Sequence, residues 1–130
     1  MKIPDRGKKL VIADGNAHVR SALRCIAEQQ ENLKITGEAS NWKELTVLLS
    51  STQPGIVFLD SRLPGSVFPE SLRALTWDYP EIAIILMTAN PVSPGFSQKG
   101  VCCHITKKDP PEKVRQALNS AESFRDYRRH

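Results

Sequence analysis

The sequence has no apolar run that approaches the roughly 20 residues needed to cross a membrane. Its beginning, MKIPDRGKK, also lacks the apolar core of a secretory signal peptide. No internal repeat, linker or low-complexity stretch is present, and a composition of 40% hydrophobic and 25% charged residues is ordinary for a globular protein. These absences predict a cytoplasmic protein with no membrane partner.

Cysteine is scarce, with residues only at Cys25, Cys102 and Cys103. Three cysteines, two of them adjacent, match neither a disulfide framework nor the spacing of paired metal ligands. Neighbouring residues of a strand point to opposite faces, so we expect Cys102 and Cys103 not to converge on one ion. We interpret all three as reduced, partly buried thiols.

The positive charge gives little support for nucleic-acid binding. The net charge is +4, and the excess lies mainly in Lys8, Lys9, Arg125, Arg128 and Arg129, near the two ends of the chain. We interpret these residues as a solvated fringe and find no candidate recognition helix. Direct nucleic-acid binding by this chain is therefore not predicted.

Strand-like and helix-like segments alternate along a chain whose length of 130 residues is that of one domain, so we expect a single domain over residues 1–130. Expected strands cover residues 8–14, 33–39, 56–60, 82–88 and 101–106. Expected helices cover residues 17–28 with Asn16 as N-cap, a segment from Trp42 to near Pro54 capped by Ser40 or Asn41, a segment from Pro69 to Pro80, and one that opens at Pro111. We interpret Trp42 and Trp77 as residues that pack these helices.

The alternation is interrupted between Asn90 and Gly100, where two prolines and two glycines occupy the place of a fourth helix. We predict a loop or a shortened, irregular fourth helix there. Five strands with helical connections otherwise predict an α/β fold, a doubly wound parallel sheet of order 2-1-3-4-5.

Polar residues follow four of the expected strands. Asp14, Asp60, Thr88 and Lys107 each lie where a strand ends, and the predicted strand order brings those ends to one edge of the sheet. No histidine is placed to serve as a hydrolytic base beside them. A carboxylate can instead attack a phosphoryl group, while a lysine, a hydroxyl and Mg²⁺ offset the charge. The competing interpretation is that Asp60 only terminates its strand in a turn.

The segment FLDSRLPG, residues 58–65, resembles the phosphoacceptor strand and turn of response-regulator receiver domains from two-component signalling. Met87-Thr88-Ala89 is similar to the family's switch-hydroxyl site, and Thr106-Lys107 to its lysine. The resemblance covers about Leu10 to Ala121. Residues 37–40, GEAS, and Pro111-Glu112 with the helix behind them look most like receivers that precede helix-turn-helix output domains.

The resemblance implies a flavodoxin-like fold and a role in phosphorelay signalling rather than enzymatic activity. Asp60 is then expected to accept phosphate from a sensor histidine kinase or a phosphotransfer protein, with Thr88 and Lys107 holding the phosphoryl group. Asp14, Asp60 and the backbone carbonyl of Arg62 are the implied Mg²⁺ ligands. A downstream protein partner and a homodimer are the implied assemblies.

Three departures from the family pattern bear on these expectations. Family members usually end the first strand with two consecutive acids, whereas here Gly15 follows Asp14, so we expect Mg²⁺ binding to be weak or absent. The helix predicted to be shortened belongs to the face that reports phosphorylation in typical receivers. His104 occupies a position that usually carries an aromatic residue, which an imidazole can mimic.

Two alternatives remain open. One is a pseudo-receiver, a binding module that works without phosphorylation, which Gly15 and the Pro91–Pro94 segment favour. The other is the receiver half of a DNA-binding transcription regulator, which the output-type resemblance favours.

Overall fold

A computed structural model describes residues 9–90 and 100–124, which form a five-stranded parallel sheet of order β2-β1-β3-β4-β5. The strands are β1 (Lys9–Ala13), β2 (Lys34–Ala39), β3 (Ile56–Asp60), β4 (Ala83–Thr88) and β5 (Val101–Thr106). The predicted strand order is confirmed. Residues 91–99, to which the prediction of a shortened fourth helix applies, lie outside the described residues, so that prediction is not tested.

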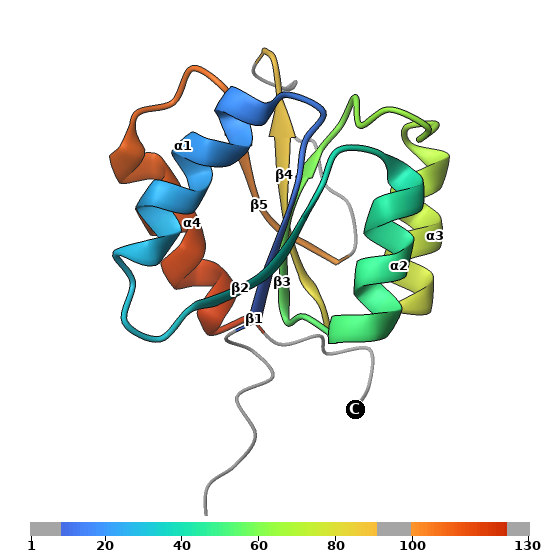
Figure 1. Cartoon of the computed structure of the whole chain (residues 1–130), viewed down its shortest axis with the longest axis horizontal. Coiled ribbons are helices and arrows are strands. Elements are labelled where there is room, and N and C mark those ends of the chain that lie inside the picture. Colours follow the sequence, from blue (N-terminus) through green and yellow to red (C-terminus); the bar gives the residue numbers. More distant parts are fainter. Residues whose placement is uncertain (1–8, 91–99, 125–130) are drawn as a thin grey trace, which may run out of the picture.

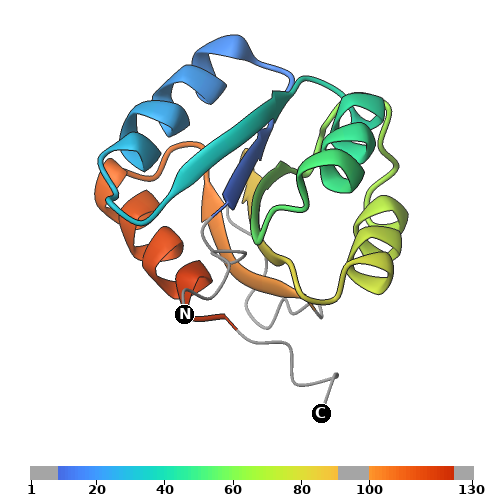
Figure 2. The same cartoon turned by 60° about the horizontal axis from the view of Figure 1, so that its bottom comes forward.

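Helices cover both faces of the sheet. They are α1 (Ala17–Glu28), α2 (Trp42–Thr52), α3 (Glu70–Asp78) and α4 (Pro111–Glu122). Helices α1 and α4 lie on one face, and α2 and α3 lie on the other (Figures 1 and 2). This is the doubly wound arrangement that the alternation of strands and helices predicts. No helix in the described part of the chain is long and apolar enough to span a bilayer.

Asparagine side chains set the starts of two helices. Asn16 accepts hydrogen bonds from the backbone N–H groups of His18 and Val19 at the start of α1. Asn41 accepts one from Glu44 N–H at 2.8 Å, so of the two candidates for α2 it is Asn41 that caps the helix. The third helix begins one residue later than expected, because Pro69 is its N-cap.

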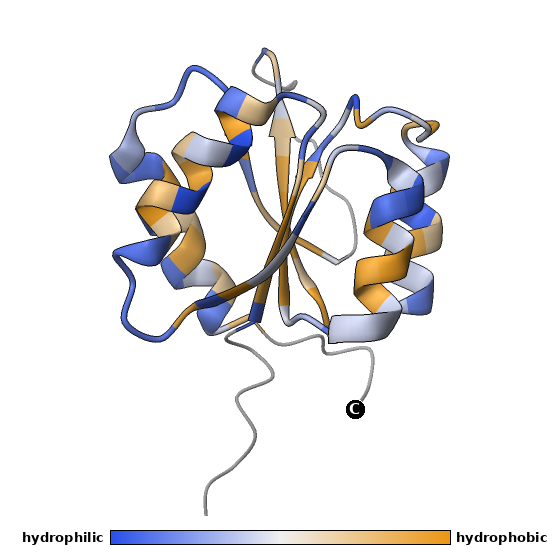
Figure 3. Ribbon diagram, in the orientation of Figure 1, coloured by the Kyte–Doolittle hydropathy of each residue, from blue (hydrophilic) through white to orange (hydrophobic). Residues whose placement is uncertain are grey.

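Each face of the sheet carries its own apolar layer, and the strands are the most hydrophobic part of the molecule (Figure 3). Successive residues of β1 alternate between the layers, Leu10 facing α1 and α4 and Val11 facing α2 and α3. All five residues of β3 are buried, as its uninterrupted apolar run predicts. This buried strand holds Asp60 in place at its end.

The expected packing role of the tryptophans holds for Trp42 and is wrong for Trp77. Trp42 packs against the layer beneath α2, whereas 81% of Trp77 is exposed. The buried face of α3 consists of Leu72, Leu75 and Thr76. Residue 77 follows this face by about 100° of helical rotation, which turns it toward solvent.

The expectation that Cys102 and Cys103 face opposite sides is also wrong. Ile84 pairs with Val101 while Ile85 pairs with Cys103, so Cys102 is an extra residue in β5. Such a bulge breaks the alternation of side chains. Both cysteines consequently pack on the side of α1 and α4.

Candidate functional site

Two buried aspartates follow neighbouring strands at the carboxyl edge of the sheet. Ala13 of β1 pairs with Leu59 of β3, so the residues that come next, Asp14 and Asp60, lie side by side. Asp14 is 1% exposed and Asp60 is 6% exposed. Because buried carboxylates need compensation, their hydrogen bonds and countercharges define the site.

The same local turn orients both carboxylates. Asp14 Oδ1 accepts a hydrogen bond from the backbone N–H of Asn16 at 2.8 Å, and Asp60 Oδ1 accepts one from Arg62 N–H at 3.1 Å. Each is a bond to the residue two positions on, as in an Asx turn. These turns leave the Oδ2 atoms of Asp14 and Asp60 for a cation.

Lys107 supplies that cation, because its Nζ lies 2.8 Å from Asp14 Oδ2 and 3.1 Å from Asp60 Oδ2. Its backbone N–H donates to Thr88 O at 3.0 Å, which fixes the start of the loop after β5. Burial lowers the pKa of Lys107, but the two carboxylates outweigh burial and the net pKa is raised above its ordinary value. The ammonium group therefore stays protonated and bridges both aspartates.

Thr88 ends β4 at the same edge, but its hydroxyl is engaged elsewhere. Thr88 Oγ1 donates to the carbonyl of Asn90 at 2.5 Å and lies 2.7 Å from His104 Nε2. A hydroxyl has a single proton, so with Asn90 as its acceptor the His104 Nε2–H must be the donor to Thr88. Sequence reasoning placed Thr88 correctly at this edge and missed its contact with His104.

Gly15 lies in the loop where the family pattern has a second acid. A Cβ at this position would lie 3.0 Å from Pro64 Cδ and 3.6 Å from the carbonyl of Ser40. A side chain there therefore requires the Pro64 ring to move by a few tenths of an ångström. Glycine avoids this contact with Pro64. Because glycine has no side chain, the site has two carboxylates, those of Asp14 and Asp60.

The donor set meets the minimum that Mg²⁺ requires from a protein. Asp14 Oδ2 is buried and has no hydrogen-bond partner of good geometry in the described part of the chain, although Lys107 lies close to it. Within residues 9–90 and 100–124, no cluster of three or more acidic, histidine or cysteine side chains could hold a metal. Mg²⁺ needs only one or two carboxylates when water fills its other positions. Asp14 and Asp60 meet that minimum.

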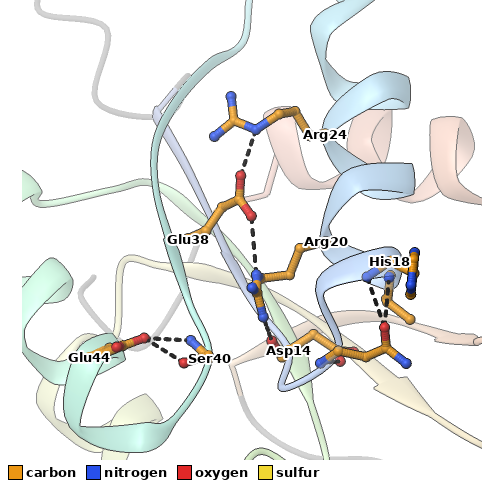
Figure 4. A network of polar contacts seen from close by, with 9 residues as sticks. Asp14, His18, Arg20, Arg24, Glu38, Ser40 and Glu44 are labelled. Carbon is orange, nitrogen blue, oxygen red and sulfur yellow. Dashed lines mark hydrogen bonds and ion pairs between the residues drawn. The ribbon is translucent and has the colours of Figure 1, made fainter.

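A charged network supports the loop after β1 (Figure 4). Arg20 Nη1 donates to the backbone carbonyl of Asp14 at 2.7 Å, and Arg20 Nε donates to Glu38 at 3.1 Å. Arg24, one turn further along α1, donates to the second oxygen of Glu38 at 2.6 Å. Sequence reasoning did not identify this network. Its signal was the four-residue spacing of the two arginines, which places them on one face of a helix.

The chain resembles known proteins in both sequence and structure. Residues 10–119 match the family model for the response regulator receiver domain. The response regulator UvrY of Escherichia coli strain K12 is 26% identical over 121 residues, which cover 91% of this chain and 56% of UvrY. The response regulator GacA of Pseudomonas aeruginosa is 24% identical over 122 residues, covering 92% of this chain and 57% of GacA. The chain thus spans little more than half the length of these curated relatives.

Solved structures share the fold. The isolated receiver (REC) domain of RcsB from Salmonella enterica serovar Typhimurium has a TM-score of 0.81 at 20% identity. The match covers 92% of this chain and 91% of the RcsB chain. A LuxR-family DNA-binding response regulator from Staphylococcus aureus has a TM-score of 0.75 at 22% identity. The match covers 89% of this chain and 99% of the Staphylococcus aureus chain. The match to the family model, which spans most of the chain, shows that the protein belongs to the response regulator receiver domains of two-component systems.

Proposed function

We propose that Asp60 accepts a phosphoryl group from the phosphohistidine of a sensor kinase or phosphotransfer protein, and that the chain acts in the cytoplasm as a signalling module rather than an enzyme. The observation that carries this proposal is the approach of Lys107 Nζ to both Asp14 Oδ2 and Asp60 Oδ2. Asp60 is the nucleophilic carboxylate, Asp14 is a second carboxylate, and Lys107 adds a fixed positive charge at the same edge of the sheet.

The transfer follows from the chemistry of these groups. A carboxylate oxygen of Asp60 forms a bond to phosphorus while the bond from phosphorus to the histidine nitrogen breaks, and the nitrogen keeps the electron pair. The product is an acyl phosphate at Asp60. Lys107 offsets the negative charge that the phosphoryl oxygens bring. Asp14, Asp60 and the Arg62 carbonyl would hold Mg²⁺, which would supply further positive charge.

Thr88 is proposed to hold a phosphoryl oxygen through its hydroxyl. That hydroxyl now donates to Asn90, so it must release the Asn90 carbonyl before it can donate to a phosphoryl group. His104 Nε2 donates to Thr88 Oγ1 and stays in contact with it while the hydroxyl hydrogen rotates from Asn90 to the phosphoryl group. The unphosphorylated site therefore holds Thr88 in a different hydrogen-bonding state from the phosphorylated one.

Acetyl phosphate tests the proposal without knowledge of the kinase. The chain is incubated with acetyl phosphate and millimolar Mg²⁺, and phosphorylation is followed by a phosphate-affinity gel and intact mass spectrometry. We expect an adduct in the wild-type chain, none in Asp60→Asn, and an unchanged adduct in the control Asp78→Asn, whose aspartate is exposed at the end of α3. No Asp60-dependent adduct would contradict the proposal.

A pseudo-receiver is the second candidate, favoured because Lys107 already compensates both carboxylates and Gly15 offers the metal no ligand. Amide hydrogen exchange with and without beryllofluoride and Mg²⁺ separates the two candidates. Unchanged exchange in β4, β5 and α4 supports a pseudo-receiver. Altered exchange that Asp60→Asn abolishes supports a phosphorylation-dependent receiver.

We also propose that the chain works as the receiver part of a longer DNA-binding regulator or with a downstream protein partner. UvrY extends well beyond the region matched here, since the match covers 56% of it. The length of the native open reading frame tests the first assembly. Light scattering of the chain with and without beryllofluoride tests whether a homodimer forms on phosphorylation.

A further inference from the structure

The bulge in β5 brings two thiols together. Cys102 Sγ and Cys103 Sγ lie 3.1 Å apart. Both side chains pack against the apolar layer of α1 and α4, whereas Val101 packs against the opposite layer. Adjacent cysteines of a regular strand would point to opposite faces, so this pair exists because of the register shift between Ile84 and Ile85.

The thiol pair lies on an edge strand and is partly exposed. β5 is the outermost strand of the sheet, and both cysteines are intermediate in exposure. Cys103 Sγ donates to the backbone carbonyl of Ala117 in α4 at 3.5 Å. With that proton directed at Ala117, the Cys102 thiol is the donor in the contact between the two sulfurs. Both residues are therefore partly open to solvent, and the geometry of the pair is already set.

The two thiols differ in acidity. Donation from Cys102, though opposed by burial, lowers the pKa of Cys103, and the same contact together with burial raises the pKa of Cys102. The thiolate is the reactive form of cysteine. Cys103 is consequently the better nucleophile of the pair.

We propose that Cys102 and Cys103 form an oxidation site, at which a low-molecular-weight disulfide such as oxidised glutathione converts the two adjacent thiols into one disulfide. The Cys103 thiolate attacks a sulfur of oxidised glutathione, which forms a mixed disulfide and releases one glutathione thiolate. Cys102 then attacks Cys103 Sγ and releases the second. The protein loses two electrons and two protons, and oxidised glutathione becomes two thiols.

Ring closure needs little movement of the sulfurs, from 3.1 Å to a bond of about 2.05 Å. Adjacent Cα atoms are only about 3.8 Å apart, less than the roughly 4.4 Å at which most disulfides begin, so the ring is strained and readily reduced. The oxidised pair has no S–H group, so the bond to the Ala117 carbonyl is lost. The expected modification is reversible and loosens the contact between β5 and α4.

The pair is separate from the aspartate site. Cys103 precedes Thr106, the last residue of β5, by about 10 Å along the strand. Neither sulfur contacts Asp14, Asp60 or Lys107. The proposal therefore stands whether or not Asp60 accepts phosphate.

Thiol counting tests the proposal on the whole chain. The reduced protein is treated with oxidised glutathione, blocked with N-ethylmaleimide and analysed by intact mass and peptide mapping. Of the three cysteines, we expect only Cys25 to remain labelled, with a disulfide between Cys102 and Cys103, and we expect dithiothreitol to restore all three labels. Cys25→Ser, which removes the exposed cysteine of α1, should close the ring as the wild type does.

The single variants show whether the partner sulfur completes the reaction. Cys102→Ser should retain a glutathione adduct on Cys103, because no neighbouring thiol displaces it; circular dichroism verifies that the variant is folded. Closure should also be faster in the folded chain than in urea, where the bulge is absent. The proposal is overturned by three surviving labels, by a stable adduct on wild-type Cys103, by a bond to Cys25, or by equal rates in urea.

Discussion

Among single residues, Lys107 is the cation of the site, because it contacts two carboxylates that the sheet buries. Asp14 is 1% exposed and Asp60 is 6% exposed, while the Lys107 side chain retains 28% of its exposure. The lysine therefore compensates two charges and remains in reach of solvent. Removing it leaves both carboxylates buried without a cation.

Lys107→Met should lower the free energy of unfolding at neutral pH by about 2 kcal/mol, less than for a fully buried pair because water partly screens the ammonium group. Urea unfolding followed by circular dichroism measures the change. Lys108→Met is the matched control, since Lys108 is exposed and has no ion-pair partner among the described residues. Equal stability of the two variants would contradict the compensating role of Lys107.

The raised pKa of Lys107 makes this contribution depend on pH. A cation whose pKa is higher in the folded state stabilises the fold fully at pH values below its unfolded pKa. The contribution is then lost as the pH rises through the higher folded value, above 10.5. The difference in stability between wild type and Lys107→Met should thus be constant near neutrality and shrink in strong alkali. A difference that grows with alkaline pH would show the opposite sign.

The positions of the site residues could be predicted from the sequence, but their contacts could not. Asp14, Asp60 and Thr88 follow apolar runs, so strand ends place them at one edge. Whether a hydroxyl faces the carboxylates or Asn90 depends on a side-chain rotation that no periodicity encodes. The bridging position of Lys107 likewise depends on two Asx turns acting together.

Among the elements, β2 and α2 approach one another closely at Gly37. A Cβ on Gly37 would lie 2.6 Å from Leu48 Cδ2 and 3.3 Å from Leu48 Cγ. Gly37→Ala should therefore destabilise the fold by about 1 to 2 kcal/mol through overpacking. The measurement is again urea unfolding. A stability equal to wild type would mean that the Leu48 side chain moves aside at little energetic cost.

A double-mutant cycle assigns that effect to the contact itself. Leu48→Ala removes the atoms that a Cβ at position 37 would meet, so Gly37→Ala should cost less in the Leu48→Ala background than alone. Leu45→Ala serves as a comparison, because Leu45 is a buried residue of α2 that is not among the atoms nearest to the added Cβ. An equal penalty in all three backgrounds would rule out the contact as its cause.

Element boundaries were predictable where a residue has a local signal. Asn16 and Pro111 mark helix starts within the sequence itself, and both are confirmed. The bulge at Cys102 has no such signal, because it is a mismatch between β5 and its partner β4. Pairing between strands far apart in sequence decides it, and the apolar pattern of one strand does not report it.

At the scale of the whole molecule, the sheet gathers residues from positions 14 to 107 at one edge while helices cover both faces (Figure 1). The alternation of strands and helices was sufficient to predict this architecture, because crossover connections in parallel sheets have few arrangements. The surface was less predictable, as the exposure of Trp77 shows. Buried residues recur with the period of their helix or strand, whereas a single exposed aromatic residue does not contribute to such a pattern.

We propose that Asp60 accepts phosphate at a site whose Mg²⁺ affinity is limited by Gly15. The direct test is the dependence of acetyl phosphate labelling on Mg²⁺ concentration in wild type and Gly15→Asp. Gly15→Ala is the control, because its methyl group crowds Pro64 without adding a ligand. We predict an Asp60-dependent adduct in all three, with half-maximal Mg²⁺ at least about tenfold lower in Gly15→Asp only. The same Mg²⁺ dependence in wild type and Gly15→Asp, or no adduct in either, would contradict this proposal.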